Sequence, residues 1–345
     1  MGATALATTV LAGVLQLAAA SLQTGPSVNT SLGPVVGVYN DGGGVSFLGI
    51  PYGDSVSGDF RWTAPRPAAA WAPSTLDATQ MPTGCPDAYT YNTTTEDCLK
   101  LNIYAPNSSV VSDSPLPVVV WIHGGGFFRG NIAKPLWQGE FLVNQSVERG
   151  KPVIMVSVDY RLGALGFLAS REWNVSGNFG IMDQQLALHW VQQHIADFGG
   201  DPSRVTVHGQ SAGAMSAYIH LVSPASAGLF QKAHIRSNVG VHYRNYTEAQ
   251  KHADTLAKSL LCLESKTRMR CLREKSFQQI IKSQLTFEYI VFFTEPGFGI
   301  NFLQWLPVVD EGTELIVGAL RQSPQCCAVT RAWLTQGKFY LGTLC

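Results

Sequence analysis

Three short apolar runs constrain the fold of this chain more than any other feature. They are LPVVVWI at residues 116–122, PVIMVSV at residues 152–158 and RVTVH at residues 204–208. Such continuous β-branched runs are typical of strands covered on both faces. Between the last two runs, residues 183–195 place Leu186, Trp190 and Ile195 at helical spacing, which predicts a connecting helix. This βαβ pattern predicts an α/β fold with a mostly parallel central sheet.

Composition and charge narrow the class of protein. The chain has 345 residues, of which 46% are hydrophobic and 14% charged, so it is too apolar for disorder and long enough for an enzyme-sized domain. Lys+Arg and Asp+Glu both total 24, so no basic field recruits nucleic acid. The sequence leaves the oligomeric state open. Residues 247–262 and 268–283 are also predicted to be helical, with the higher charge of a surface subdomain.

The N-terminal residues are typical of a secretory signal peptide. An apolar run from Leu6 to Leu17 is followed by Ala18-Ala19-Ala20 before Ser21, a small-residue cleavage pattern. The alternative is a membrane anchor, but the run is shorter than the ~20 apolar residues that span a bilayer. We therefore expect residues 1–20 to be removed, and residues 21–345 to form a secreted domain without a transmembrane segment.

Glycosylation sequons agree with secretion. Six Asn-x-Ser/Thr sequons without proline open at Asn29, Asn92, Asn107, Asn144, Asn174 and Asn245. These acceptor sites are used only in the secretory pathway.

Cysteine spacing also agrees with secretion. Cys85 and Cys98 bracket one short loop, and Cys262 and Cys271 bracket another. A disulfide closing a loop of this size contributes about 3 kcal/mol in the chain-entropy model. Buried free thiols are the alternative, whereas a metal site is disfavoured because neither pair has Cys-x-x-Cys spacing or a neighbouring histidine. No partner is assigned to the other three cysteines, which are Cys326, Cys327 and Cys345.

The strongest chemical signal follows the third predicted strand. Residues 209–213, GQSAG, match G-x-S-x-G directly before a helix-forming run at residues 214–221. A sharp turn at Ser211 needs glycine on both sides, because larger residues would collide with the strand or the helix. The turn places the hydroxyl at a helix N-terminus, which favours developing negative charge. Ser211 is therefore the candidate nucleophile, and the alternative is a chance match.

A second glycine motif, HGGGF at residues 123–127, directly follows the first predicted strand. Acyl transfer forms a tetrahedral oxyanion, and glycines let backbone N–H groups approach it closely. Gly125 and Gly126 are the expected donors, with Ala212 as the third. A flexible turn is one alternative. A phosphate-binding loop is disfavoured because no Gly-Lys-Ser/Thr follows.

With these motifs the chain resembles the type-B carboxylesterases, the family that includes cholinesterases and fungal lipases. The matching stretches are FLGIPYG (47–53), EDCLKLNIY (96–104), HGGGF (123–127), VDYRLG (158–163), GNFG (177–180) and FGGDP (198–202). The resemblance implies an α/β-hydrolase fold and hydrolysis of small-molecule or lipid esters through a serine acyl-enzyme, without a cofactor or metal.

The resemblance also assigns structural roles to several residues outside these two glycine motifs. It implies that Glu96 pairs with Arg61 and that Arg161 pairs with Asp183, so these charges are structural rather than catalytic. It also matches residues 262–271 to the second short disulfide loop of the family.

The remaining members of a catalytic triad are not identified. The family places an acid and then a histidine well after the serine, but no histidine follows His252 in this chain. The histidines that follow Ser211 more closely are interpreted as surface or structural residues; they are His220, His234, His242 and His252. Glu311 lies in a motif similar to that of the acid, yet its setting favours a segment that precedes the acid strand.

Three expectations follow from the missing histidine. The fold lacks its C-terminal strands and helices, an apolar edge strand is exposed near residues 232–237, and the chain has little or no esterase activity. Two other functions stay open: a secreted non-catalytic binding module of the cholinesterase type, and a structural glycoprotein.

Overall fold

The computed structural model describes residues 25–107, 114–237, 243–294, 305–309, 332–335 and 338–341, with side chains described up to residue 285 and at residues 305–309. The expected signal peptide, Glu311 and the three unassigned cysteines therefore lie outside the described residues.

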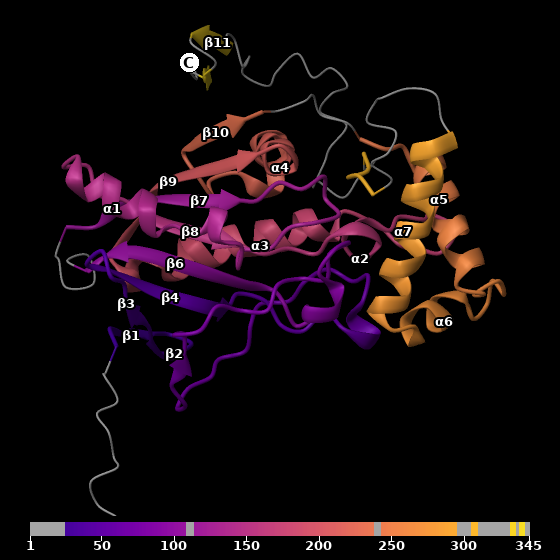
Figure 1. Ribbon diagram of the computed structural model, residues 1–345, viewed down its shortest axis with the longest axis horizontal. Helices are drawn as coiled ribbons and strands as arrows, with labels where there is room; N and C mark the ends of the chain where they lie inside the picture. Colours follow the sequence, from indigo (N-terminus) through magenta and orange to yellow (C-terminus); the bar gives the residue numbers. More distant parts are fainter. Residues whose placement is uncertain are drawn as a thin grey trace, which may run out of the picture.

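A seven-stranded sheet forms the centre of the protein (Figure 1). Its strands, in spatial order, are β10 (Lys232–Arg236), β9 (Gly200–Gln210), β7 (Leu116–Ile122), β8 (Ile154–Val158), β6 (Lys100–Pro106), β4 (Gly44–Pro51) and β3 (Val38–Tyr39). Strands β10, β9, β7 and β8 pair in parallel, whereas β8, β6, β4 and β3 pair antiparallel. The three strands predicted from the sequence are all parallel. The antiparallel half comes from the first 106 residues, which precede the βαβ units.

Helices cover both faces of this sheet. Alternate residues of a strand face opposite sides, and the sheet residues accordingly divide between two clusters. Val118 and Val120 pack in the main core with α3 (Phe179–His194) and α4 (Ala212–Val222). Trp121 belongs to a second cluster that includes Val143 of α1 (Glu140–Glu148). The predicted helix between the second and third strands is therefore present as α3.

The remaining helices lie together beyond one end of the sheet (Figure 1). They are α2 (Gly163–Phe167), α5 (Tyr246–Ser259), α6 (Arg268–Glu274) and α7 (Phe277–Thr294). The single helix predicted for residues 268–283 is wrong, because Ser276 begins a new helix with a capping box. Ser276 Oγ accepts from Gln279 N–H at 3.2 Å, and Gln279 Oε1 accepts from Ser276 N–H at 2.9 Å.

Two small sheets complete the described fold. One contains β1 (Ser27–Thr30), β2 (Gly33–Val36) and β5 (Leu76–Asp77). The other is an antiparallel pair, β11 (Ala332–Thr335) and β12 (Lys338–Leu341). Within the described ranges, no helix has the length and apolarity needed to cross a membrane.

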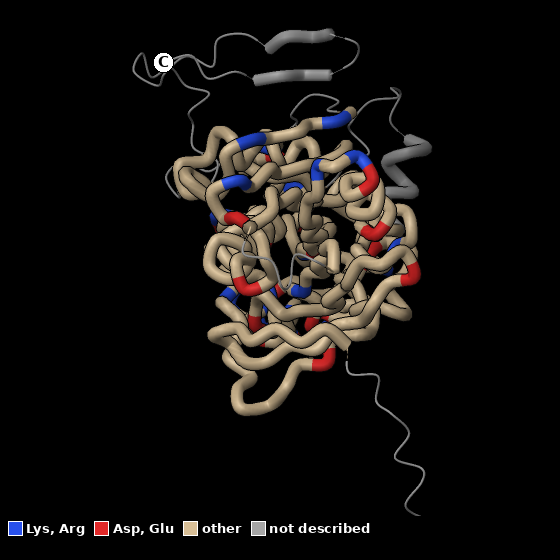
Figure 2. The backbone as a smooth tube through the Cα atoms, turned by 90° about the vertical axis from the view of Figure 1, so that its left-hand side faces the viewer, with Lys and Arg blue, Asp and Glu red and all other residues tan. Residues whose placement is uncertain are grey.

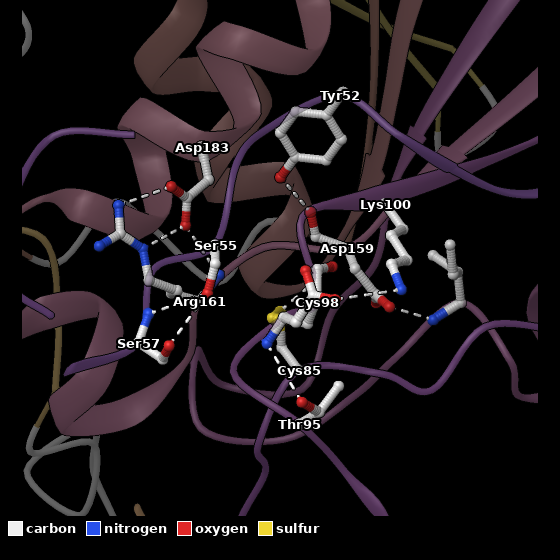
Figure 3. The surroundings of a disulfide bond; sticks show 12 residues. Tyr52, Ser55, Ser57, Cys85, Thr95, Cys98, Lys100, Asp159, Arg161 and Asp183 are labelled. Atoms are coloured by element: carbon white, nitrogen blue, oxygen red, sulfur yellow. Dashed lines mark hydrogen bonds and ion pairs between the residues drawn. A yellow bond between two sulfur atoms is a disulfide. The ribbon is translucent and has the colours of Figure 1, made fainter. Parts of the chain in front are cut away.

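Two buried ion pairs join distant segments, in the pairing that the resemblance implied. Arg61 Nε donates to Glu96 Oε1 at 2.7 Å, and Arg61 Nη1 donates to the carbonyl oxygen of Lys275 at 2.8 Å, just beyond α6. Arg161 binds Asp183 with two hydrogen bonds, of 2.8 Å from Nε and 2.7 Å from Nη2 (Figure 3). All four side chains are nearly inaccessible to solvent, which suits a structural role.

The structure contains the two expected disulfides. Cys85 is bonded to Cys98 (Figure 3), and Cys262 is bonded to Cys271. The first closes a loop between β5 and β6, and the second closes the connection between α5 and α6.

The edge strand is less apolar than expected. Strand β10 pairs only with β9 among the described strands, and none of its side chains is buried. Lys232 and Arg236 are exposed at its two ends. The expected position of the edge strand is therefore confirmed, but its expected apolar character is wrong at the two ends, where charged side chains oppose pairing with another chain. In Figure 2, Lys and Arg residues, drawn in blue, lie along the uppermost described segment of the backbone.

Candidate active site

Ser211 forms a strained turn between β9 and α4. Its φ and ψ angles are 56° and −120°, a region that non-glycine residues rarely adopt. The Ser211 N–H donates to the carbonyl oxygen of Arg236 on β10 at 3.1 Å, and the Ser211 carbonyl oxygen accepts from Met215 N–H at 3.0 Å. The surrounding structure therefore holds Ser211 in this conformation, and strain of this kind clusters at functional sites.

The glycines on either side of Ser211 are required by close backbone packing. A Cβ atom on Gly209 would lie 2.0 Å from the carbonyl oxygen of Gly213. A Cβ atom on Gly213 would lie 2.0 Å from the carbonyl oxygen of Ile122. Because both contacts are with backbone atoms, neither position accommodates a larger residue without movement of a strand or helix.

The fold brings the two glycine motifs together. Ile122 at the end of β7 lies opposite Gly209 in the parallel strand β9, so both motifs leave the sheet at the same edge. A Cβ atom on Gly124 would lie only 3.1 Å from Ser211 Cβ. The loop that follows β7 therefore packs directly against the turn that carries Ser211.

The three expected oxyanion donors have open N–H groups. Gly125 and Gly126 have positive φ angles of 118° and 65°. Ala212 is the first residue of α4, where an N–H group has no acceptor within the helix. Within the described part of the chain, no hydrogen bond is donated by the N–H groups of Gly125, Gly126 or Ala212. An oxyanion hole requires such unoccupied donors.

The buried side chain of His123 supports the glycine loop, a name used here for residues 123–130. Its ring is fully buried between Trp137 and Tyr160, with centroid separations of 5.2 Å and 4.5 Å. Its Nδ1 lies 2.9 Å from the carbonyl oxygen of Gly124, and the Tyr160 hydroxyl donates to the His123 carbonyl oxygen at 2.8 Å. These contacts give His123 a structural place in the loop.

Asp159 is a second buried support for the same loop. Its Oδ1 lies 3.6 Å from His123 Nε2 and accepts from Ile132 N–H at 2.9 Å. Its carbonyl oxygen accepts from the Tyr52 hydroxyl at 2.6 Å (Figure 3). Burial raises the pKa of Asp159, and the neighbouring His123 ring and the hydrogen bond from Ile132 N–H oppose this shift.

Asp87 connects the first disulfide loop to the glycine loop. Its side chain is buried, and Oδ1 accepts from the N–H groups of Tyr89 and Thr90, both at 2.7 Å. Oδ2 accepts from Gly130 N–H at 3.2 Å. A Cβ atom on Gly130 would lie 2.6 Å from His123 Nδ1, so Gly130 packs against the residues that precede the oxyanion donors.

The described histidines after Ser211 are occupied elsewhere. His220 Nδ1 lies 2.9 Å from Ser226 Oγ and Nε2 lies 3.1 Å from Gln184 Oε1, and burial lowers its pKa to about 4. His234 stacks on His208 at 4.3 Å. Burial also lowers the pKa of His252, on α5, to about 4. In the described ranges no histidine is hydrogen-bonded to Ser211 Oγ, and His242 lies outside these ranges.

Metal ligation has no support in the described part of the chain. No group of three or more His, Cys, Asp or Glu side chains that could hold a metal ion is found there.

Sequence reasoning missed the residues that support the glycine loop. Asp159 directly follows the central strand β8, at the edge of the sheet that carries Ser211, and this position could have identified it as a candidate site residue. Asp87 follows a proline and accepts from the N–H groups of the second and third residues after it, a local turn pattern that Asp favours. Its bond to Gly130 spans 43 residues and leaves no local pattern.

Comparisons with known proteins agree with this geometry. The sequence model of the carboxylesterase family matches residues 24–336. The cholinesterase of Mus musculus is 39% identical over 77% of this chain and 45% of its own length. The cocaine esterase of Oryctolagus cuniculus is 37% identical over 74% of this chain and 51% of its own length. The para-nitrobenzyl esterase of Bacillus subtilis is 42% identical over 61% of this chain and 43% of its own length.

Comparison with solved structures identifies the fold. A PNB esterase structure superimposes with a TM-score of 0.73 and 35% sequence identity, covering 83% of this chain and 58% of that chain. PNB esterases are α/β-hydrolases, so the predicted fold class is confirmed. The chain spans about half the length of the curated relatives it matches. With the family model covering nearly all of the sequence, this chain belongs to the carboxylesterase family.

Proposed function

We propose that this chain supplies the nucleophile and the oxyanion hole of a carboxylic ester hydrolase. Ser211 Oγ attacks the acyl carbon of an ester, and the N–H groups of Gly125, Gly126 and Ala212 stabilise the oxyanion that forms. The alcohol then leaves and an acyl-enzyme remains on Ser211. The observation that supports this role is the strained turn at Ser211, packed against a loop whose N–H groups are open.

The substrate class follows from the reaction and from the relatives. The names of the relatives describe hydrolysis of a choline ester, of cocaine and of para-nitrobenzyl esters. We propose a small-molecule or lipid ester for this chain, hydrolysed without a cofactor or metal.

The proton of Ser211 needs a base, and the described histidines do not supply one. A serine hydroxyl at its ordinary pKa is a weak nucleophile without an adjacent base. In a serine protease, loss of the histidine lowers turnover about 10⁶-fold, and about 10³ to 10⁴ over water is retained from the oxyanion hole and binding. We therefore propose that the 345-residue chain by itself has little or no steady-state esterase activity.

The proposed lack of a base offers a direct test, because both acylation and deacylation depend on a base. The purified chain is incubated with p-nitrophenyl butyrate, with and without imidazole as a soluble base, and Ser211→Ala serves as the control. We expect slow butyrylation of Ser211, seen by intact mass and peptide mapping, and faster turnover with imidazole in the wild-type chain alone.

Two outcomes of this experiment contradict the proposal in different ways. A chain that is never butyrylated at Ser211, in either condition, is a binding module rather than an esterase. Ordinary turnover without imidazole, abolished by Ser211→Ala, shows that a histidine of this chain acts as the base.

We also propose that the protein is secreted and N-glycosylated. Both disulfides support this route, since disulfides persist in oxidising compartments. Five of the six sequon asparagines are exposed; they are Asn29, Asn92, Asn107, Asn174 and Asn245. Sequencing of the exported protein should find a new N-terminus near Ser21, and a product that stays in the cell with its first 20 residues contradicts the proposal.

A further inference from the structure

We infer that the first sugar of an N-glycan on Asn174 docks into the neighbouring surface pocket, where it connects helix α5 to the body of the protein. This inference rests on the proposed secretion and not on ester hydrolysis. It starts from the position of Asn174, which is one of the residues that line this pocket.

The side chain of Asn174 is accessible for glycan attachment. The residue is exposed, and in the described part of the chain its side-chain amide has no hydrogen-bond partner. Its backbone is fixed with a φ angle of 56°, which Asn tolerates better than most residues. The Asn174 N–H donates to the carbonyl oxygen of Arg171 at 3.2 Å, and the bridge between Ser170 and Val175 closes the turn. The attachment point is therefore rigid.

The pocket beside Asn174 has the size and chemistry for a sugar ring. Its volume is about 330 Å³, at the lower end of the range for small-molecule pockets. The partly exposed side chains of Thr63, Ser176 and Tyr246 line it, and the buried residues Trp62 and Ser170 lie beneath its surface. A pyranose ring combines an apolar C–H face with hydroxyl and amide groups, so it suits walls of this mixed kind.

The pocket walls come from α5, the turn that carries Asn174 and the loop at Thr63, and Ser170 Oγ in this turn donates to Gln250 Oε1 of α5 at 2.6 Å. Tyr246 is the first residue of α5, and its hydroxyl donates to the carbonyl oxygen of Ser176 at 2.8 Å. Its ring lies 4.4 Å from the Arg171 guanidinium. A sugar in this pocket would contact α5, the turn that carries Asn174 and the loop at Thr63 together. The glycan therefore stabilises the docking of α5 in addition to solubilising the surface.

Asn29 provides a matched control. It is also exposed, but it lies on the edge strand β1 and lines none of the described cavities. The variants Asn174→Gln and Asn29→Gln each remove one sequon and keep a neutral amide, so the difference between them reports the docking of the glycan.

The experiment uses the chain secreted by cultured cells that perform N-glycosylation. Glycopeptide mapping first establishes which sequons are occupied, and the native protein is then treated with PNGase F or with endoglycosidase H. PNGase F cuts between Asn and the first sugar, whereas endoglycosidase H leaves that sugar attached. If the first sugar is docked, PNGase F releases the Asn174 glycan several times more slowly than the Asn29 glycan, and heat denaturation abolishes the difference.

Thermal unfolding gives an independent readout. We expect Asn174→Gln to lower Tm by about 2 to 4 °C, a shift that corresponds to a small loss of unfolding free energy. We expect Asn29→Gln to leave Tm nearly unchanged. Trimming with endoglycosidase H should preserve Tm. Equal PNGase F release at the two sites, or an unoccupied Asn174 beside an occupied Asn29, overturns the inference. A chain without glycans at any sequon overturns the proposed secretion as well.

Discussion

Asp87 Oδ2 accepts a hydrogen bond from the N–H group of Gly130, although the two residues belong to different loops. The same carboxylate accepts from Tyr89 and Thr90, so one buried side chain fixes both the disulfide loop and the far end of the glycine loop. At the near end Asp159 Oδ1 lies 3.6 Å from His123 Nε2, so the glycine loop has a buried carboxylate on each side.

Removal of the Asp87 carboxylate should destabilise the protein and loosen the glycine loop. Asp87→Ala removes the acceptor of three N–H groups, of which the one on Gly130 is buried, and an unsatisfied buried donor costs about 1 to 3 kcal/mol. Asp87→Asn keeps one oxygen acceptor and should lose less. Urea unfolding measures the stability, and amide hydrogen exchange at Gly130 measures the local effect. Equal exchange at Gly130 in the wild-type and Asp87→Ala proteins contradicts this account.

The strain at Ser211 predicts that Ser211→Gly is more stable than Ser211→Ala. Glycine adopts the observed angles freely, whereas alanine keeps the Cβ atom that makes them unfavourable. After allowance for the greater freedom of glycine in the unfolded chain, we expect a difference of about 1 kcal/mol. Both variants lack the hydroxyl, so denaturant unfolding of the pair isolates the backbone term. A Ser211→Gly protein that is less stable than Ser211→Ala shows that the turn is unstrained.

Buried histidines should make the protein less stable in mild acid. The folded-state pKa of His220 is lowered to about 4, below its ordinary value of 6.5, so the unfolded chain binds the proton first as pH falls. Its contribution is therefore fully present above about pH 6.5 and is lost as pH falls toward 4, by about 3 kcal/mol at 1.36 kcal/mol per pKa unit. Asp159 acts in the opposite sense, since its pKa is raised.

The comparison of the wild-type protein with His220→Gln isolates this effect. We expect the variant to lose stability at pH 7, because the contacts with Ser226 and Gln184 are weakened, but to show a flatter decline between pH 7 and pH 5. Parallel curves of unfolding free energy for the two proteins would show that His220 is not the titrating group.

The six sequons should differ in occupancy because one asparagine is packed against a turn. A Cβ atom on Gly42 would lie 2.0 Å from Asn144 Nδ2, the atom that carries a glycan, whereas the other five asparagines are exposed. We expect the folded, exported protein to lack a glycan at Asn144. Glycopeptide mapping checks this, and Asn144→Gln should leave the glycan mass unchanged. Full occupancy at Asn144 contradicts the packing.

Much of the parallel half of the sheet could be predicted because it depends on local patterns. The runs at residues 116–122 and 152–158 are largely apolar on both faces, and the glycines beside Ser211 follow from the geometry of one turn. Strands β4 and β6 were not predicted, since they pair with each other across a long stretch of chain and were noticed only as family motifs. The support of the glycine loop was missed for the same reason, because the bonds from Asp87 to Gly130 and from Asp159 to Ile132 join residues far apart in the sequence.

The hydrogen bond from Ser211 N–H to Arg236 links the candidate nucleophile to the outermost strand of the described sheet. For protein engineering, this makes β10 an unsuitable place for an inserted peptide or tag, although its exposed position would otherwise recommend it. In evolution, substitutions along β10 therefore affect the geometry at Ser211 as well as the solubility of the protein. Variation at this edge should therefore be restricted in relatives that keep a working serine, and freer in those that have lost it.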